Sequence, residues 1–161
     1  MPHIKKKVLM NNNTPWDDIK TPTNDLNIRQ IKGTKDVPLC WGKDSSGNCI
    51  FVIELEGNHQ EFYIKNKVSA HGINTDLQLF EPSKKQGLVI TLENHVDRDL
   101  FASLCNTLVD SISDVSDSAV ALSLALSQIK RWKIFLAGRR ARILSFEEIR
   151  GLFSELIFFQ N

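Results

Sequence analysis

Seven cationic side chains gather near the end of this 161-residue chain, at spacings that could contact a polyanion. They are Lys130, Arg131, Lys133, Arg139, Arg140, Arg142 and Arg150. Lysine and arginine in such density can contact the phosphates of nucleic acid, which supply most of the affinity of many DNA-binding proteins. The same residues also fit a plainer interpretation, as the solvated face and C-terminal charges of one helix together with a linker. The sequence leaves both interpretations open.

The overall charge hides this concentration of cations. There are 20 Lys and Arg against 19 Asp and Glu, for a formal net charge of +1. Basic residues nevertheless dominate residues 1–35 and 130–161, while the middle of the chain is acidic. A basic end beside an acidic middle permits contact with nucleic acid or with an acidic partner.

The sequence lacks the motifs of metal-binding sites, nucleotide-binding loops and membrane-spanning helices. The cysteines, Cys40, Cys49 and Cys105, are odd in number and lack metal-ligand spacing, and the histidines show neither H-x-H nor HExxH. The glycines form neither a P-loop nor G-x-G-x-x-G. No stretch approaches the roughly 20 apolar residues that span a bilayer. We therefore expect free thiols, no metal site, no membrane contact and a cytoplasmic location.

Short runs rich in β-branched and aromatic residues begin at Val37 and continue to residue 93. In "NCIFVIELEG" the apolar residues alternate, with Cys49, Phe51, Ile53 and Leu55 on one face and Ile50 and Val52 on the other. Part of this strand should therefore be covered on both sides. The runs are 37–42, 48–57, 60–66, 75–81 and 87–93. Short gaps between them predict an antiparallel sheet of about five strands over residues 37–93.

The elements on either side of these runs are predicted to be helical. "TPWDDIK" (14–20) resembles the start of a short helix, with Thr14 as cap and Trp16 as anchor in the core. After His95 the apolar spacing becomes helical, which predicts one helix capped by Asp97. It also predicts a second helix that is capped by Asp117 or Ser116 and ends at Gly138. Strands followed by C-terminal helices predict an α+β fold.

The last segment carries a definite helix start. Ser145 and Glu148 have the spacing of a capping box, and Leu144 and Ile149 that of a hydrophobic staple. The helix that follows is too apolar for an exposed terminal helix. It either closes the core of this domain or begins another, and residues 144–161 are expected to lead into a further core.

The C-terminal half resembles bacterial PD-(D/E)XK motif proteins. In that family a helix containing "RW" leads to "LS-x-EE-x-x-GL-x-GEL-x-FL", and this chain has "RW…FL" followed by "LSFEEIRGLFSELIFF". "GLVITLE…DLFASLCNTLVDSI" also resembles a family segment, so the matches run in order from about residue 87 to the end. Ser154 replaces the usual glycine, and the N-terminal third agrees only in length and strand content.

The resemblance implies a restriction-endonuclease-like protein encoded in phage-defence or restriction–modification clusters. Its partners there would be duplex DNA, methyltransferases, MORC-like ATPases and helicase-like proteins. It also implies an N-terminal accessory domain before a nuclease core that uses Mg²⁺. Glu155 matches a first-helix carboxylate of that core.

The catalytic motif itself is not found in the sequence. Phosphodiester cleavage of this type needs a carboxylate cluster for Mg²⁺ and a nearby lysine. Asp18-Ile19-Lys20 spells D-x-K but lacks an upstream aspartate, and Gln128-Ile129-Lys130 lies within an amphipathic helix. We interpret both as chance matches. These residues alone are not expected to cleave DNA.

The sequence is compatible with two functions. The first is an accessory domain (33–140, preceded by residues 1–32) that positions DNA or docks partners for an endonuclease-like protein. The alternative is a stand-alone adaptor or dimerisation domain without nucleic-acid contact. A homodimer would use Leu152, Leu156 and Phe159.

Overall fold

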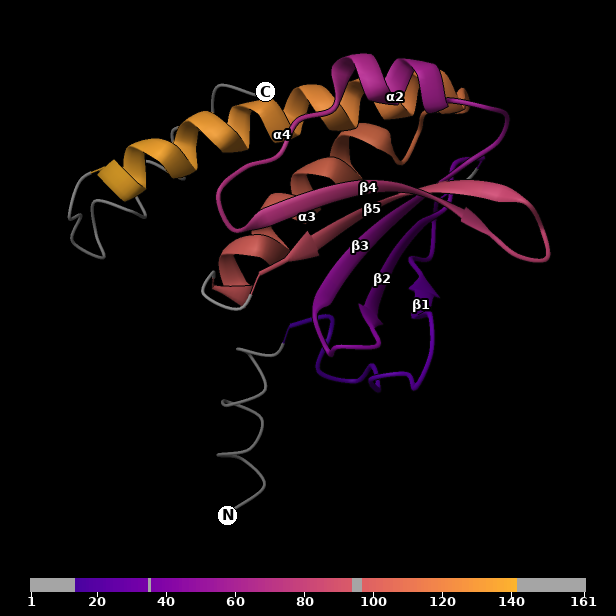
Figure 1. Ribbon diagram of the computed structural model, residues 1–161, viewed down its shortest axis with the longest axis horizontal. Helices are drawn as coiled ribbons and strands as arrows, with labels where there is room; N and C mark the ends of the chain where they lie inside the picture. Colours follow the sequence, from indigo (N-terminus) through magenta and orange to yellow (C-terminus); the bar gives the residue numbers. More distant parts are fainter. Residues whose placement is uncertain (1–13, 35, 94–96, 142–161) are drawn as a thin grey trace.

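A sheet carries two long helices on one face in the computed structural model of the chain (Figure 1). The structure describes residues 14–34, 36–93 and 97–141. Five antiparallel strands, counted within these residues, lie in the order β1-β2-β3-β5-β4. The elements are β1 (Leu26–Gln30), β2 (Leu39–Asp44), β3 (Cys49–Leu55), α2 (Gln60–Asn66), β4 (Ile73–Phe80), β5 (Lys85–Leu92), α3 (Arg98–Ile112) and α4 (Ser118–Ala141). The predicted α+β class is confirmed.

One of the five predicted strands is wrong, and another strand takes its place. Residues 60–66 form the helix α2, in which Tyr63 is buried while Phe62 and Ile64 are exposed. Three adjacent apolar residues fit neither period cleanly, and the polar ends of the segment favour a helix because Glu61 and Lys65 pair one turn apart at 3.2 Å. The fifth strand is β1, an edge strand whose residues are mostly exposed.

The two-sided burial predicted for β3 is confirmed. Cys49, Phe51, Ile53 and Leu55 belong to the main core beneath the helices. Ile50 and Val52 face the opposite side and form a smaller cluster with Cys40 and Val89. The register explains this cluster, because Cys40 is paired with Val52 and Val52 with Val89. Side chains directly opposite on neighbouring strands share a face.

The segment 14–20 forms two successive turns, not the predicted short helix. Backbone bonds run from the Asp17 N–H to the Thr14 carbonyl and from the Ile19 N–H to the Trp16 carbonyl. The expected cap is also reversed, because the Asp17 carboxylate accepts bonds from both the N–H and the hydroxyl of Thr14, each 2.9 Å long. These two bonds lower the pKa of Asp17. Trp16 is fully buried, as predicted.

The long helices begin where the sequence predicts, but α4 extends further. The Asp97 carboxylate accepts a bond from the Asp99 N–H at 2.8 Å, and Asp117 caps α4 through the Ala119 N–H at 2.8 Å. Helix α4 passes through Gly138, predicted as its end, and continues to Ala141. A mid-helix glycine costs only about 1 kcal/mol relative to alanine, which the rest of a long helix can offset.

Helices α3 and α4 are joined in the core by a polar contact. The Gln128 side-chain amide donates to the Thr107 hydroxyl at 3.1 Å, and that hydroxyl donates to the Leu104 carbonyl at 2.5 Å. Gln128 and Thr107 are the buried polar residues of the described chain. None of the described helices combines the length and apolarity that crossing a bilayer requires.

Candidate nucleic-acid interface

Helix α4 is basic along its second half and carries no aspartate or glutamate. Its sequence, SAVALSLALSQIKRWKIFLAGRRA, contains five cations in its last twelve positions. Lys130, Arg131 and Lys133 are exposed, while Ile129 and Trp132 between them are fully buried. The helix therefore packs one face into the core and presents the cations on the other. Without acidic neighbours on the same helix, these cations have no partner one turn away.

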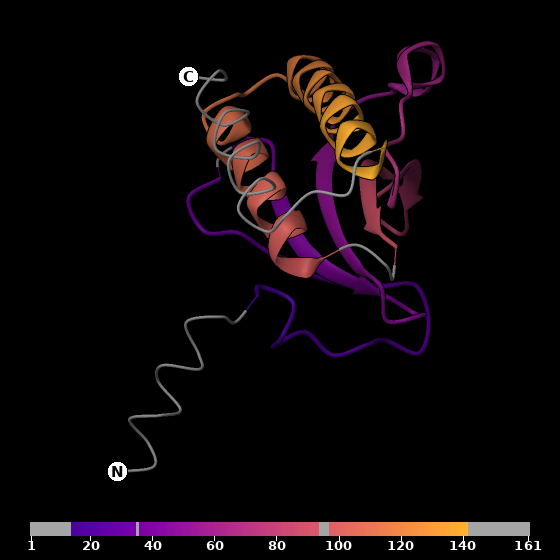
Figure 2. The same cartoon turned by 90° about the vertical axis from the view of Figure 1, so that its left-hand side faces the viewer.

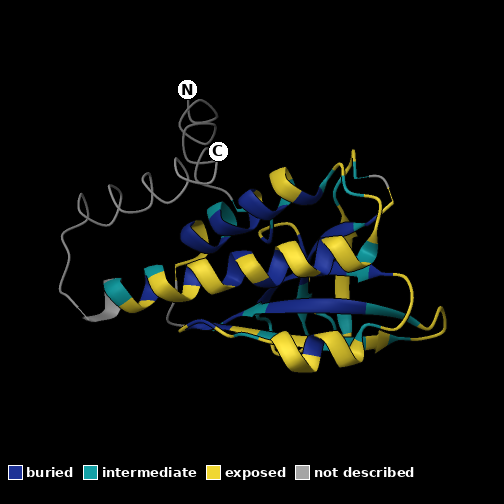
Figure 3. Cartoon of the chain, turned by 90° about the horizontal axis from the view of Figure 1, so that it is seen from above, coloured by how far each residue is buried: buried dark blue, intermediate teal, exposed yellow. Residues whose placement is uncertain are grey.

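A cleft of about 420 Å³ separates α4 from α2. Figures 2 and 3 show α4 lying between α3 on one side and α2 on the other. Three lysines, two serines, an asparagine and three apolar residues line the cleft. They are Phe62, Lys65, Asn66, Lys67, Val68, Ser123, Leu126, Ser127 and Lys130. The cleft thus brings a predicted cation of α4 together with lysines that lie more than 60 positions earlier in the chain.

Two of the three lysines have no ion-pair partner among the described residues. Lys65 forms an exposed ion pair with Glu61 at 3.2 Å, which partly neutralises it. Lys67 and Lys130 form no side-chain hydrogen bond or ion pair with the described residues. Both are exposed to solvent at the cleft. Two unpaired ammonium groups facing one cleft repel each other and attract an anion.

The floor and the α4 wall of the cleft add different groups. Ser123 and Ser127 stand one turn apart on α4 and present hydroxyls that can donate to an oxyanion. Leu126, which is buried, and Val68, which is half-buried, supply an apolar floor. The cleft therefore combines cations and hydroxyl donors with an apolar surface.

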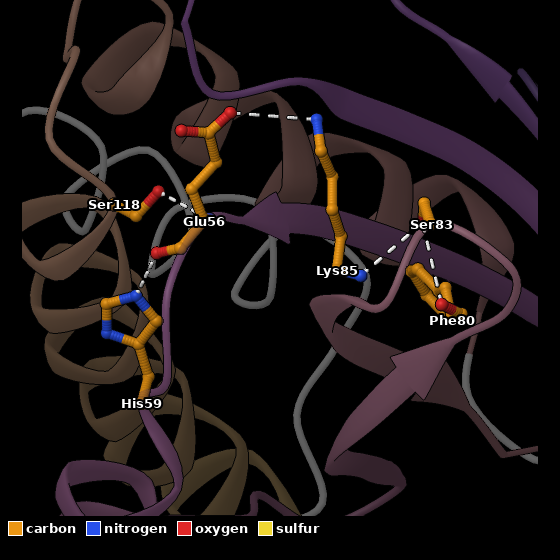
Figure 4. A network of polar contacts seen from close by, with 6 residues as sticks. All are labelled: Glu56, His59, Phe80, Ser83, Lys85 and Ser118. Carbon is orange, nitrogen blue, oxygen red and sulfur yellow. Dashed lines mark hydrogen bonds and ion pairs between the residues drawn. The ribbon is translucent and has the colours of Figure 1, made fainter.

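A polar network fixes the start of α2 against the rest of the domain (Figure 4). The ring Nε2 of His59 contacts the Glu56 carbonyl oxygen at 2.6 Å, and the Glu56 N–H donates to the Ser118 hydroxyl at 2.9 Å. The Glu56 carboxylate also pairs with Lys85 at 3.7 Å. Since Ser118 begins α4 and Lys85 begins β5, this network ties the segment before α2 to both elements.

The network is structural in its geometry, although it contains Ser, His and Glu. The Ser118 hydroxyl is engaged by a backbone N–H, and the His59 ring meets a backbone carbonyl instead of the serine. A nucleophilic serine needs its base within hydrogen-bond reach of the hydroxyl. A further contact, 3.2 Å between the Tyr63 and Thr75 hydroxyls, holds α2 beside β4.

The predicted cations divide into three groups. Lys130 lines the cleft, Lys133 follows it one turn along the same side of α4, and Arg131 points about 100° away around the helix. Arg139 and Arg140 fall in the last turn of α4, with side chains outside the described structure. The remaining predicted site residues lie outside the described residues: Arg142, Arg150 and Glu155, together with Leu152, Leu156 and Phe159.

Lys65 and Lys67 were missed by the sequence analysis because residues 60–66 were predicted as a strand. A strand there would have separated them from α4. The available signal was the Glu61–Lys65 spacing, which suits a helix. With that helix placed, the two lysines and Lys130 become candidates for a shared surface.

The described residues do not fit a Mg²⁺ site. They contain no group of three or more His, Cys, Asp or Glu side chains arranged to hold a metal ion. In the D-x-K match, Asp18 lies in a turn and Lys20 follows that turn. In the second match, Gln128 is buried and donates a hydrogen bond to Thr107. Neither match has the strand context that the motif requires.

A comparison with protein-family profiles gives a match that covers nearly the whole chain. Among curated proteins and among solved structures, no match was found. A family profile, by contrast, matches residues 12–161, which include the sheet, α3, α4 and the cleft. The resemblance noted in the C-terminal half is confirmed by this profile. The chain belongs to the family described as "Putative PD-(D/E)XK family member, (DUF4420)".

Proposed function

We propose that this domain positions DNA for a PD-(D/E)XK endonuclease-like protein of bacterial phage defence or restriction–modification. In this proposal the domain is an accessory module that works in the cytoplasm. In this proposal, phosphodiester hydrolysis and its Mg²⁺ belong to a separate nuclease core. The described residues contain no group of three or more His, Cys, Asp or Glu side chains that could hold a metal ion. The family membership and the basic cleft between α2 and α4 support this function. A MORC-like ATPase, a helicase-like protein and a methyltransferase are the proposed partners.

The observation that carries the proposal is the presence at one cleft of two lysines, Lys67 and Lys130, that form no ion pair with the described residues. A lysine that contacts a phosphate releases condensed counterions from DNA, and this release drives binding. A lysine already paired with a carboxylate contributes less, because it exchanges one anion for another. Lys133 and the other cations of α4 extend the same surface beyond the cleft.

The test is salt-dependent binding of a short blunt DNA duplex to the full chain, measured by fluorescence anisotropy. Wild-type protein should lose affinity steeply between roughly 50 and 200 mM salt. Each lysine lost from a phosphate contact should lower the slope of log affinity against log salt by about 1. Lys67→Ala and Lys130→Ala should each show this change, and the double charge reversal to glutamate should abolish binding.

Lys20→Glu and Lys32→Glu provide the matched control. Both lysines are exposed and lie outside the cleft, so their reversal makes the same change in net charge. If the control pair weakens binding as much as the cleft pair, the affinity reflects net charge alone and the cleft has no special role. Absence of duplex binding at low salt would refute the proposed function.

A second candidate function rests on the outer face of α4. Val120, Leu124 and Ile134 are 46%, 39% and 71% exposed and fall on one side of the helix. Exposed apolar side chains on one face favour a protein contact. This observation supports an adaptor that docks a partner or a second copy without touching nucleic acid. Leu124→Glu, at a position without a lysine or arginine one turn away, should then abolish association, measured by light scattering. The adaptor should also show no DNA binding even at low salt.

A further inference from the structure

The wall that α2 contributes to the cleft carries an aromatic side chain. Phe62 lines the cleft and is 42% exposed, although phenylalanine is usually buried. Its neighbour Lys65 lies one turn further along the same helix, and Asn66 bonds back to the Phe62 carbonyl at 2.9 Å. An exposed aromatic ring therefore stands beside the lysines, on a helix held in place by Tyr63.

This combination suits a ligand that is both anionic and aromatic. A simple anion would use the lysines and the serine hydroxyls, but it would leave Phe62 and the apolar floor without a role. A nucleotide offers a phosphate to the cations and a flat base to the ring. Proteins that hold unpaired nucleic acid use this pairing of cations with stacking aromatics.

The size of the cleft limits how much nucleic acid can enter. Its volume of about 420 Å³ lies near the low end of the roughly 300–1,000 Å³ typical of small-molecule pockets. A duplex can lay its phosphates across the exposed Lys67 and Lys130 at the rim of the cleft, but it cannot enter, and its bases are stacked on one another. Only an unpaired nucleotide can present its base to Phe62 while its phosphate reaches Lys67 or Lys130.

We infer that the cleft between α2 and α4 binds an unpaired nucleotide next to a DNA duplex, with the base on Phe62. The inference rests on the proposed function, since the duplex is held by Lys67 and Lys130 at the rim of the cleft and by the other cations of α4. It adds a specific substrate structure, a junction between duplex and single strand. A blunt duplex contains no such junction.

The experiment compares a blunt duplex with the same duplex carrying a single-stranded thymidine tail, using the full chain. The tail should raise affinity roughly fivefold or more. Phe62→Ala should remove that gain and leave the affinity for the blunt duplex unchanged. Phe62→Trp should keep the gain because tryptophan still stacks. Phe62→Leu should lose it because leucine is apolar without a ring face.

Ile64→Ala is the matched control. Ile64 is 55% exposed on the same helix but does not line the cleft, so its loss should leave both affinities unchanged. Circular dichroism of each variant establishes that the fold is retained.

The outcomes separate the inference from the proposed function. Blunt-duplex binding without any gain from the tail overturns the inference and leaves the proposed function standing. Equal losses in Phe62→Ala and Ile64→Ala also overturn it. Displacement of tailed DNA by poly-glutamate, with Phe62→Ala behaving as wild type, assigns the cleft to an acidic peptide instead. Failure to bind either DNA at low salt defeats both ideas.

Discussion

The indole N–H of Trp16 donates a hydrogen bond to the carbonyl oxygen of Ile50 at 2.8 Å, across 34 positions of sequence. The Trp16 ring is stacked on Phe101 of α3 with 5.2 Å between centroids, and it meets Trp41 of β2 edge-on at 5.0 Å. A residue of the N-terminal segment thus joins the sheet to a helix. The segment before residue 33 therefore contributes to the core as well as to the sheet edge.

Replacing Trp16 by phenylalanine should lower the free energy of unfolding by about 1–3 kcal/mol. The change leaves the Ile50 carbonyl without its donor and also reduces the buried ring area. Urea unfolding followed by circular dichroism measures the difference. Asp18→Ala, at an exposed position in the same turn, should be nearly neutral. Equal stability of Trp16→Phe and wild type would show that the contact is not needed.

Two glycine-to-alanine changes should have opposite signs. At Gly42 a Cβ would lie 2.7 Å from the Asn27 carbonyl oxygen and 2.8 Å from Cγ2 of Ile28, so alanine forces β1 away from β2. Overpacking of this kind costs about 1–3 kcal/mol. At Gly138, inside α4, such a Cβ would meet no atom of the described residues within 4 Å apart from its chain neighbours and the backbone of its own helix, and alanine should stabilise by about 0.5–1 kcal/mol.

Denaturant midpoints of the two alanine variants test this pair. Each variant serves as the control of the other, because the chemical change is identical. A destabilised Gly138→Ala would mean that α4 does not continue through that position in solution.

The buried contact between Thr107 and Gln128 should show coupling in a double-mutant cycle. Thr107→Val leaves the Gln128 amide buried without an acceptor, which costs about 1–3 kcal/mol. Adding Gln128→Leu removes the stranded amide, so the double variant should be less unstable than the sum of the single changes. Urea unfolding of all four proteins gives the coupling energy. Strict additivity would contradict a direct bond between α3 and α4.

The buried thiols should make the protein less stable in alkaline solution. Burial, together with the nearby Glu54 carboxylate, raises the pKa of Cys40 from 9.0 to about 12, and burial raises the pKa values of Cys49 and Cys105. The unfolded chain therefore loses these protons near pH 9 while the folded chain retains them. Stability is fully present below that pH and falls as the pH rises above it.

Urea midpoints at about pH 8 and about pH 10 measure the alkaline loss of stability. Cys40→Ala should show a smaller loss between the two than wild type, because one titrating group has been removed. The three thiols should also resist thiol reagents until the chain unfolds. Identical pH profiles for variant and wild type would contradict a retained proton on Cys40.

The sequence predicted the parts of the fold in which burial imposes a clear period. The alternation in β3 was readable because Phe51 and Ile53 face one core while Ile50 and Val52 face another. The start of α3 was readable because Asp97 precedes a regular apolar stripe. Both features depend on local residues, and the family resemblance in the C-terminal half likewise depended on contiguous motifs.

The elements that were missed depend on tertiary contacts. Strand β1 has no buried residue, only a half-buried Leu26, and its pairing depends on the space above Gly42, which only the fold reveals. Helix α2 buries only Tyr63, so its apolar pattern is weak. Since the cleft exists only when α2 lies beside α4, the sequence could identify Lys130 but not its neighbours in the cleft.

The absence of acidic residues from α4 has a consequence for how the purified protein behaves. A chain with a formal charge of +1 would be expected to interact weakly with ion-exchange media. Local charge governs adsorption, however, and helix α4 carries its cations without any carboxylate between them. Heparin and sulfonate resins should therefore retain the protein even above its sequence pI of about 7.7, at a pH where its average charge would predict elution in the flow-through.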